Sequence, residues 1–152
     1  MTDDFIQLIV AVLALVFGAA FEEMLPKAMG VGFPVLLATV HFFAFRRGVA
    51  ATVLFALAAG AVEDALCALP PMTSGSYFLL SAALVHWSRL PRAAAALTYA
   101  GYQVWLAVWL VGLGGGVFVR MLVALPIGLL TAFAVDAAMA WTWRKAAVDE
   151  CA

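Results

Sequence analysis

The stretch from Gly48 to Tyr77, GVAATVLFALAAGAVEDALCALPPMTSGSY, decides the fold class of this chain. Its first part is an apolar run of small and aliphatic residues, and a bilayer core about 30 Å thick needs about 20 such residues in a helix. Two adjacent carboxylates, Glu63 and Asp64, lie inside this run, and the double proline Pro70-Pro71 follows it. Because an ionised side chain is costly inside a membrane, these carboxylates need either a partner or a function.

The composition of the whole chain supports a membrane protein. Hydrophobic residues make up 67% of the 152 residues and charged residues 11%, whereas soluble globular proteins contain about 45–50% and about 25%. The net charge is −1 and the eight Lys and Arg residues are scattered. This excludes nucleic-acid binding, because a phosphate backbone needs a basic patch. We therefore expect an all-α integral membrane protein with a single domain.

Six apolar stretches are bounded by charged residues or by Gly and Pro. We expect a bundle of six transmembrane helices at residues 5–21, 33–45, 48–69, 77–88, 93–113 and 121–143. The acidic N-terminus predicts that the first stretch is a retained helix and not a cleaved signal peptide. The second and fourth stretches are short for a bilayer. They either mark a cavity inside the bundle or are shielded from lipid by their neighbours.

The basic residues predict the orientation of the bundle. Six of them fall on one expected side of the membrane: Arg46, Arg47, Arg89, Arg92, Arg144 and Lys145. The other side receives only Lys27 and Arg120. This asymmetry predicts that both termini are cytoplasmic, and the loops on the outer side are too short to form a domain.

The sequence contains a weak internal repeat. The segments 21–25 and 62–66 each carry an acidic pair at the end of an outward helix. Each is followed by a prolyl turn and a short helix that ends in His, an aromatic residue and Arg. Duplicated helical hairpins would produce this pattern, and so would generic anchoring residues at the two membrane interfaces.

Small residues recur every fourth position along the third stretch and therefore share one helix face. This face consists of Gly48, Thr52, Ala56, Gly60 and Asp64. Small residues at this spacing let two helices approach closely in lipid. We expect the face to contact another helix, either of this chain or of a partner protein. A second candidate contact face carries Ala14 and Gly18 in the first stretch.

Three acidic residues form the candidate polar site. Asp64 is expected to point into the bundle, either to contact a ligand or to accept structural hydrogen bonds from the loop that follows it. Glu63 is expected to reach the water interface. Asp136 lies deep in the last stretch and must be paired or protonated, either as a structural acid or in a proton relay with a histidine. Its candidate partners are His41, His86, Gln103 and Arg144.

The chain lacks the sequence motifs of common enzymes and cofactor sites. It contains no GxSxG, no HExxH and no phosphate-binding loop. His41 and His86, without a third ligand beside them, do not form a metal site and are expected at the membrane interface. Cys67 and Cys151 have no CxxC spacing. We expect no enzymatic activity, no cofactor and no metal.

Segments in the middle of the chain carry a resemblance to a known family. They are Pro34-Val35-Leu36-Leu37, Arg47-Gly48, and Gly60-Ala61-Val62-Glu63-Asp64-Ala65-Leu66 with the following Pro70-Pro71 and Gly75. Over roughly residues 34–90 the chain resembles the bacterial rod-shape-determining protein MreD family, and Asp64 falls on that family's aspartate. The Ala-rich fifth stretch, the Gly114–Gly116 turn and Glu63 beside the aspartate depart from the family pattern.

The resemblance implies a multi-pass scaffold in the bacterial cytoplasmic (inner) membrane. Such a protein binds the bitopic protein MreC and other elongation-complex proteins, and so connects the MreB filament with peptidoglycan synthesis and rod shape. The family is also similar in fold to the S components of energy-coupling-factor transporters. The alternative function is therefore a vitamin-binding S component. A vitamin site needs several polar and aromatic groups around an enclosed pocket, and the few polar residues on the outer side favour the scaffold.

Overall fold

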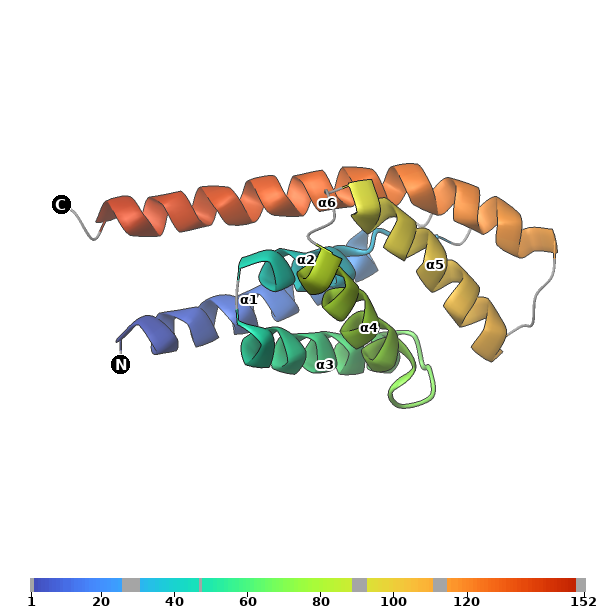
Figure 1. Ribbon diagram of the computed structural model, residues 1–152, viewed down its shortest axis with the longest axis horizontal. Helices are drawn as coiled ribbons and strands as arrows, with labels where there is room; N and C mark the ends of the chain where they lie inside the picture. The colour runs from blue at the N-terminus through green and yellow to red at the C-terminus, as the bar shows by residue number, and fades with distance from the viewer. Residues whose placement is uncertain (1, 26–30, 47, 89–92, 111–114, 150–152) are drawn as a thin grey trace.

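A computed structural model of the protein describes residues 2–25, 31–46, 48–88, 93–110 and 115–149. Across these ranges the chain folds into six α-helices and contains no β-strand. In chain order the helices are α1 (Thr2–Met24), α2 (Val35–Arg46), α3 (Val49–Leu66), α4 (Thr73–Ser88), α5 (Ala93–Leu110) and α6 (Gly115–Asp149) (Figure 1). The all-helical fold class and the six helices are confirmed.

Several expected features lie outside the described residues. They are the prolyl turn after α1 with Lys27, the basic residues Arg47, Arg89 and Arg92, the end of the fifth predicted stretch at residues 111–113, and Cys151.

The turn between α3 and α4 differs from the predicted boundaries. α3 ends at Leu66 and not at residue 69, because Cys67 caps it and Ala68 adopts a left-handed backbone with φ 51°. α4 begins at Thr73, four residues before the predicted start. Ser76 donates a hydrogen bond from its hydroxyl to the carbonyl of Thr73, at 3.1 Å. The polar residues after the double proline are therefore helical, and they lengthen the short fourth helix by one turn.

The short helix α2 occupies the centre of the molecule and contacts each of the other five helices (Figure 1). Its side chains Leu36, Leu37 and Val40 are at most 2% exposed. Because neighbours surround α2 on all sides, it does not need to span a bilayer alone. Shielding by neighbours, one of the two explanations for the short stretches, thus describes α2.

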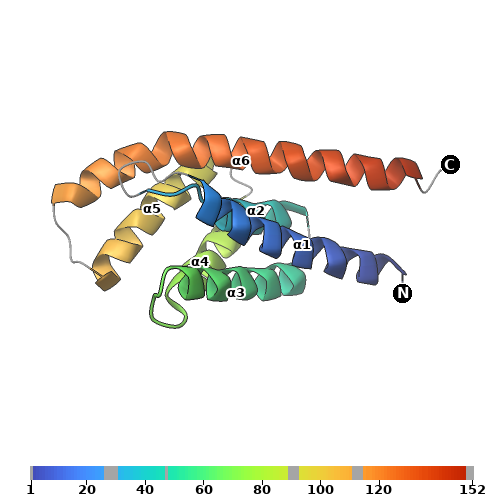
Figure 2. The same cartoon turned by 180° about the vertical axis from the view of Figure 1, so that it is seen from behind.

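The remaining helices form two close pairs and one peripheral helix. α3 packs mainly against α4, and α5 packs mainly against α6. Among the described residues α1 has backbone within 8 Å, measured between Cα atoms, only of α2 and α3, and α6 lies farther away. Seen from behind, α1 and α6 diverge from the bundle toward the end where α1 begins and α6 ends (Figure 2).

Two helices are long and apolar enough to cross a membrane, over Val49–Leu66 in α3 and Gly116–Trp141 in α6. The protein itself buries only 33% and 22% of these two segments. A helix that is apolar all round belongs either in a protein core or in a membrane. Since most residues of both segments are not buried within the protein, these helices favour a membrane protein.

Candidate functional site

The predicted small-residue face of α3 is used within the protein. Four of its five residues are buried: Thr52, Ala56, Gly60 and Asp64. The fifth, Gly48, directly precedes the helix and is exposed. A Cβ atom added to Gly60 would lie 2.2 Å from the Cα atom of Gly75 in α4. The helix that meets this face at Gly60 is therefore α4, so of the two alternatives the contact at Gly60 is with a helix of this chain.

Asp64 fastens the start of α4 to the end of α3. Its Oδ1 atom accepts a hydrogen bond from the backbone N–H of Ser74, at 2.7 Å, and its side chain is 6% exposed. A carboxylate at a helix N-terminus satisfies an N–H group that has no partner within the helix, and it interacts favourably with the helix dipole. The structural role considered for Asp64 is thus the one the structure displays.

A second contact continues this network to α5. The hydroxyl groups of Ser74 and Tyr102 share a hydrogen bond of 2.5 Å. Asp64, Ser74 and Tyr102 therefore link the end of α3 and the first turn of α4 to the middle of α5. The Oδ2 atom of Asp64 is buried and has no hydrogen-bond partner among the described residues.

Glu63 meets a second carboxyl group, that of Glu22 in α1. The two side chains are hydrogen-bonded to each other. Glu22 also accepts a hydrogen bond at Oε1 from the backbone N–H of Leu36, 2.8 Å away in the first turn of α2. An ionised carboxylate is only an acceptor, so the Glu22–Glu63 contact requires one proton on the pair.

The environment of Glu22 favours its protonated form. Glu22 lies just beyond the first predicted span, residues 5–21. Burial, followed by the hydrogen bond and the charge of Glu63, raises the pKa of the Glu22 carboxyl well above its ordinary value, while the N–H groups of Leu36 and Val35 oppose this shift. The sequence analysis included Glu22 in the acidic pair of the repeat but not in the candidate site. The internal repeat, which aligns the acidic pair that contains Glu22 with the pair that contains Glu63, was the sequence signal that could have identified Glu22.

The carboxyl pair lines a small cavity between α1, α3 and α5. The cavity has a volume of about 120 Å³. The polar side chains in its wall are Glu22, Glu23, Glu63, Tyr99, Tyr102 and Gln103. Ligand pockets for vitamin-sized molecules usually measure about 300–1,000 Å³. The cavity therefore has room for a few water molecules but not for a vitamin.

Asp136 and the two histidines lie apart from this cavity. Asp136 in α6 is partly exposed on the surface of the protein. His86 is exposed, and its Nδ1 atom lies 3.1 Å from the carbonyl oxygen of Ala44. His41 is 4% exposed and neither ring nitrogen has a hydrogen-bond partner among the described residues. His41 is therefore a core residue and not the interface residue expected.

An apolar groove separates α1 from α6, with α2 beneath it. Its volume is about 450 Å³. The groove is lined by Ala14, Phe17, Gly18, Phe21, Leu25, Phe33, Val35, Thr39, Leu130, Thr131, Ala134, Val135, Ala138 and Met139. The hydroxyl groups of Thr39 and Thr131 donate to carbonyl groups of their own helices, at 2.7 and 2.8 Å. These bonds satisfy both hydroxyl donors, so the groove suits an apolar occupant.

Small side chains occur on both walls of the groove. Ala14 and Gly18 of α1, and Ala134 and Ala138 of α6, line it at a spacing of four residues. A Cβ atom on Gly18 would lie 2.9 Å from Cδ2 of Leu36, so Gly18 also allows α1 to pack closely on α2. Sequence analysis identified Ala14 and Gly18. It missed Ala134 and Ala138, because only the fold brings α6 opposite α1.

Within the described part of the chain, no group of three or more His, Cys, Asp or Glu residues could hold a metal ion. No family model, curated protein or solved structure matches this chain. The function is therefore inferred from the groove, the cavity, the buried polar contacts and the sequence pattern of this protein alone.

Proposed function

We propose that this protein is a non-enzymatic membrane scaffold of the MreD type, and that it binds the transmembrane helix of a bitopic partner. The observation that carries the proposal is the apolar groove between α1 and α6. Among the described residues no Cα atom of α1 lies within 8 Å of a Cα atom of α6. α1 and α6 form the two sides of the groove and α2 forms its base, so a helix of the partner can lie between them.

The outer surface supports a location in a bilayer. Large apolar side chains are exposed along several helices, including Val16 and Phe17 on α1, Leu54 on α3, Leu97 on α5 and Leu130 on α6, each between 58 and 70% exposed. Soluble monomers rarely expose large contiguous apolar patches. In the proposed state the apolar parts of the six helices are embedded, and α2 depends on its neighbours for contact with an apolar environment.

A helix is the occupant that the walls of the groove favour. Lipid tails are as apolar as leucine, so helices associate in membranes through close packing and not through the hydrophobic effect. Ala14 on one wall and Ala134 and Ala138 on the other leave room for close backbone approach. A partner helix with small residues on one face would fit both walls.

The biological setting of the scaffold comes from the resemblance to MreD. In this setting the protein lies in the bacterial cytoplasmic membrane with both termini in the cytoplasm. It binds an MreC-like protein of the cell-elongation machinery and connects the cytoskeletal filament with peptidoglycan synthesis. The cavity of about 120 Å³ is too small for a vitamin, and the groove of about 450 Å³ has few of the polar groups that a vitamin site needs, so both count against the alternative S component.

Co-purification with the MreC-like protein of the same bacterium tests the proposal. Ala138 lines the groove and is exposed, and Ala137 is exposed on the same turn of α6 but does not line the groove. We expect Ala138→Trp to fill the groove and reduce recovery of the partner at least about tenfold, equivalent to about 1.4 kcal/mol.

Ala137→Trp is the matched control, and it should leave recovery unchanged. Equal recovery of the partner with both variants would contradict docking in the groove. Failure of the unsubstituted protein to retain the MreC-like protein at all would contradict the scaffold function.

A further inference from the structure

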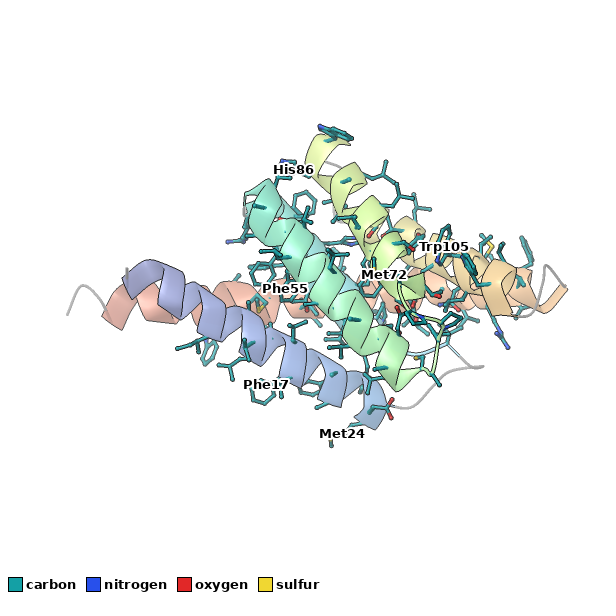
Figure 3. The ribbon with its side chains drawn as sticks, turned by 90° about the horizontal axis from the view of Figure 1, so that it is seen from below. Phe17, Met24, Phe55, Met72, His86 and Trp105 are labelled. Carbon is teal, nitrogen blue, oxygen red and sulfur yellow. The ribbon has the colours of Figure 1, made fainter. Side chains whose placement is uncertain are left out.

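Glu22 in α1 and Glu63 in α3 connect these two helices near their C-terminal ends. α1 contacts only α2 and α3 among the described residues. α1 and α3 converge toward the end marked by Met24, where the carboxyl pair lies, and Phe17 projects on the side of α1 away from α3 (Figure 3). The hydrogen bonds of Glu22 to Glu63 and to the N–H of Leu36 are thus placed where α1 meets the rest of the bundle.

The Glu22–Glu63 contact exists only while one proton is present. If both carboxyl groups ionise, two negative charges face each other at hydrogen-bond distance in a partly enclosed cavity. Like charges at this distance repel strongly where the dielectric constant is low. Glu22 can remain bound to the N–H of Leu36 in its ionised form, because that contact favours a carboxylate. The contact with α3 is the one that is lost.

We propose that the Glu22–Glu63 pair is a proton-dependent latch, which holds the end of α1 against α3 when protonated and releases it when both carboxyl groups are ionised.

The other titratable groups around the pair do not replace the missing proton. On α1 Glu23 is exposed, and beyond α3 the thiol of Cys67 lies 3.7 Å from Oε1 of Glu63. Asp64 is engaged by Ser74. From α5, Tyr99 and Tyr102 line the same cavity, and Tyr99 donates its hydroxyl hydrogen to the carbonyl of Gly32. The described residues that line the cavity from the segment before α2, from α2 and from α4 carry no charge.

The latch is closed at low pH and opens as the pH rises. The protonated pair is favoured in the folded state, so its contribution to the α1–α3 contact is complete at low pH and is lost as the pH rises through the ionisation of the pair. α1 is also one wall of the apolar groove. Release of α1 would therefore widen the groove; this consequence rests on the proposed function, whereas the movement of α1 does not.

Spin labels on α1 and α3 test the latch in the purified full-length protein without any partner. Cys67 and Cys151 are replaced by Ser, and labels are attached through Phe17→Cys and Leu54→Cys, at positions 58 and 70% exposed. We expect the distance between the labels to be short and well defined at about pH 6. It should shift to longer and broader values as the pH rises to about 11, beyond the ordinary range of carboxyl ionisation.

Two amide variants make the test specific. In Glu63→Gln or Glu22→Gln an amide N–H can donate to the remaining carboxylate without titrating, so the distance should stay short at both pH values. Glu23→Gln is the matched control on the same turn, and it should behave like the spin-labelled protein that keeps both Glu22 and Glu63. A distance that does not change with pH in the unsubstituted pair would overturn the latch, and so would an equal lengthening in both amide variants.

Discussion

Gly60 shows how a single residue sets the distance between two helices. Its hydrogen atom faces the backbone of Gly75, and a methyl group in its place would overlap the Cα atom at 2.2 Å. The spacing of small residues in the sequence predicted that α3 contacts another helix at this position. The identity of that helix depends on the α3–α4 turn, in which Ala68 and Met72 both adopt positive φ angles that non-glycine residues seldom adopt.

We expect Gly60→Ala to destabilise the protein by about 1–3 kcal/mol, because the clash is with backbone that cannot move aside without separating α3 from α4. Thermal unfolding in detergent, followed by circular dichroism, would show a lower midpoint. Gly48→Ala is the control, since nothing lies within 4 Å of a Cβ atom added there. Similar midpoints for the two variants would contradict the close approach at Gly60.

Asp64 acts at the scale of a helical element, because it satisfies an N–H group at the start of α4. The sequence predicted that this carboxylate points inward. It also left a ligand-binding role open, and the contact with Ser74 supplies a structural role instead. Glu63, one residue earlier, was expected at the water interface, yet it forms a contact with α1 that no pattern within α3 predicts.

Asp64→Ala should loosen the first turn of α4. Loss of a helix cap costs about 0.5–2 kcal/mol, and we expect faster hydrogen exchange at the amide groups of Ser74 and its neighbours, measured by mass spectrometry. Asp64→Asn keeps a side-chain oxygen acceptor and should retain most of the protection. If Asp64→Ala left exchange in this turn unchanged, Asp64 would not be the cap of α4.

At the scale of the whole molecule, the surface is the decisive feature. The two helices that are long and apolar enough to cross a bilayer have most of that length outside the protein core. The groove between α1 and α6 adds a further apolar surface that the protein does not cover itself.

This surface predicts that the protein, expressed in a rod-shaped bacterium, is retained in the membranes after extraction with alkaline carbonate, which removes peripheral proteins. We expect it in the membrane pellet, and in solution only after detergent is added. The cytoplasmic protein MreB, detected in the same samples, serves as the comparison for peripheral association. Release of this protein by carbonate alone would contradict its insertion in the bilayer.

The sequence by itself determined the helical class, the six helices, and the small-residue face of α3, because helix period and hydrophobicity are local properties of the chain. It also identified the acidic pairs near the ends of α1 and α3. Only the tertiary structure decided that α4 meets the face at Gly60, that Glu22 meets Glu63, and that α1 and α6 face each other across a groove. Those contacts join residues far apart in the chain, and they depend on how the helices cross, which no local pattern specifies.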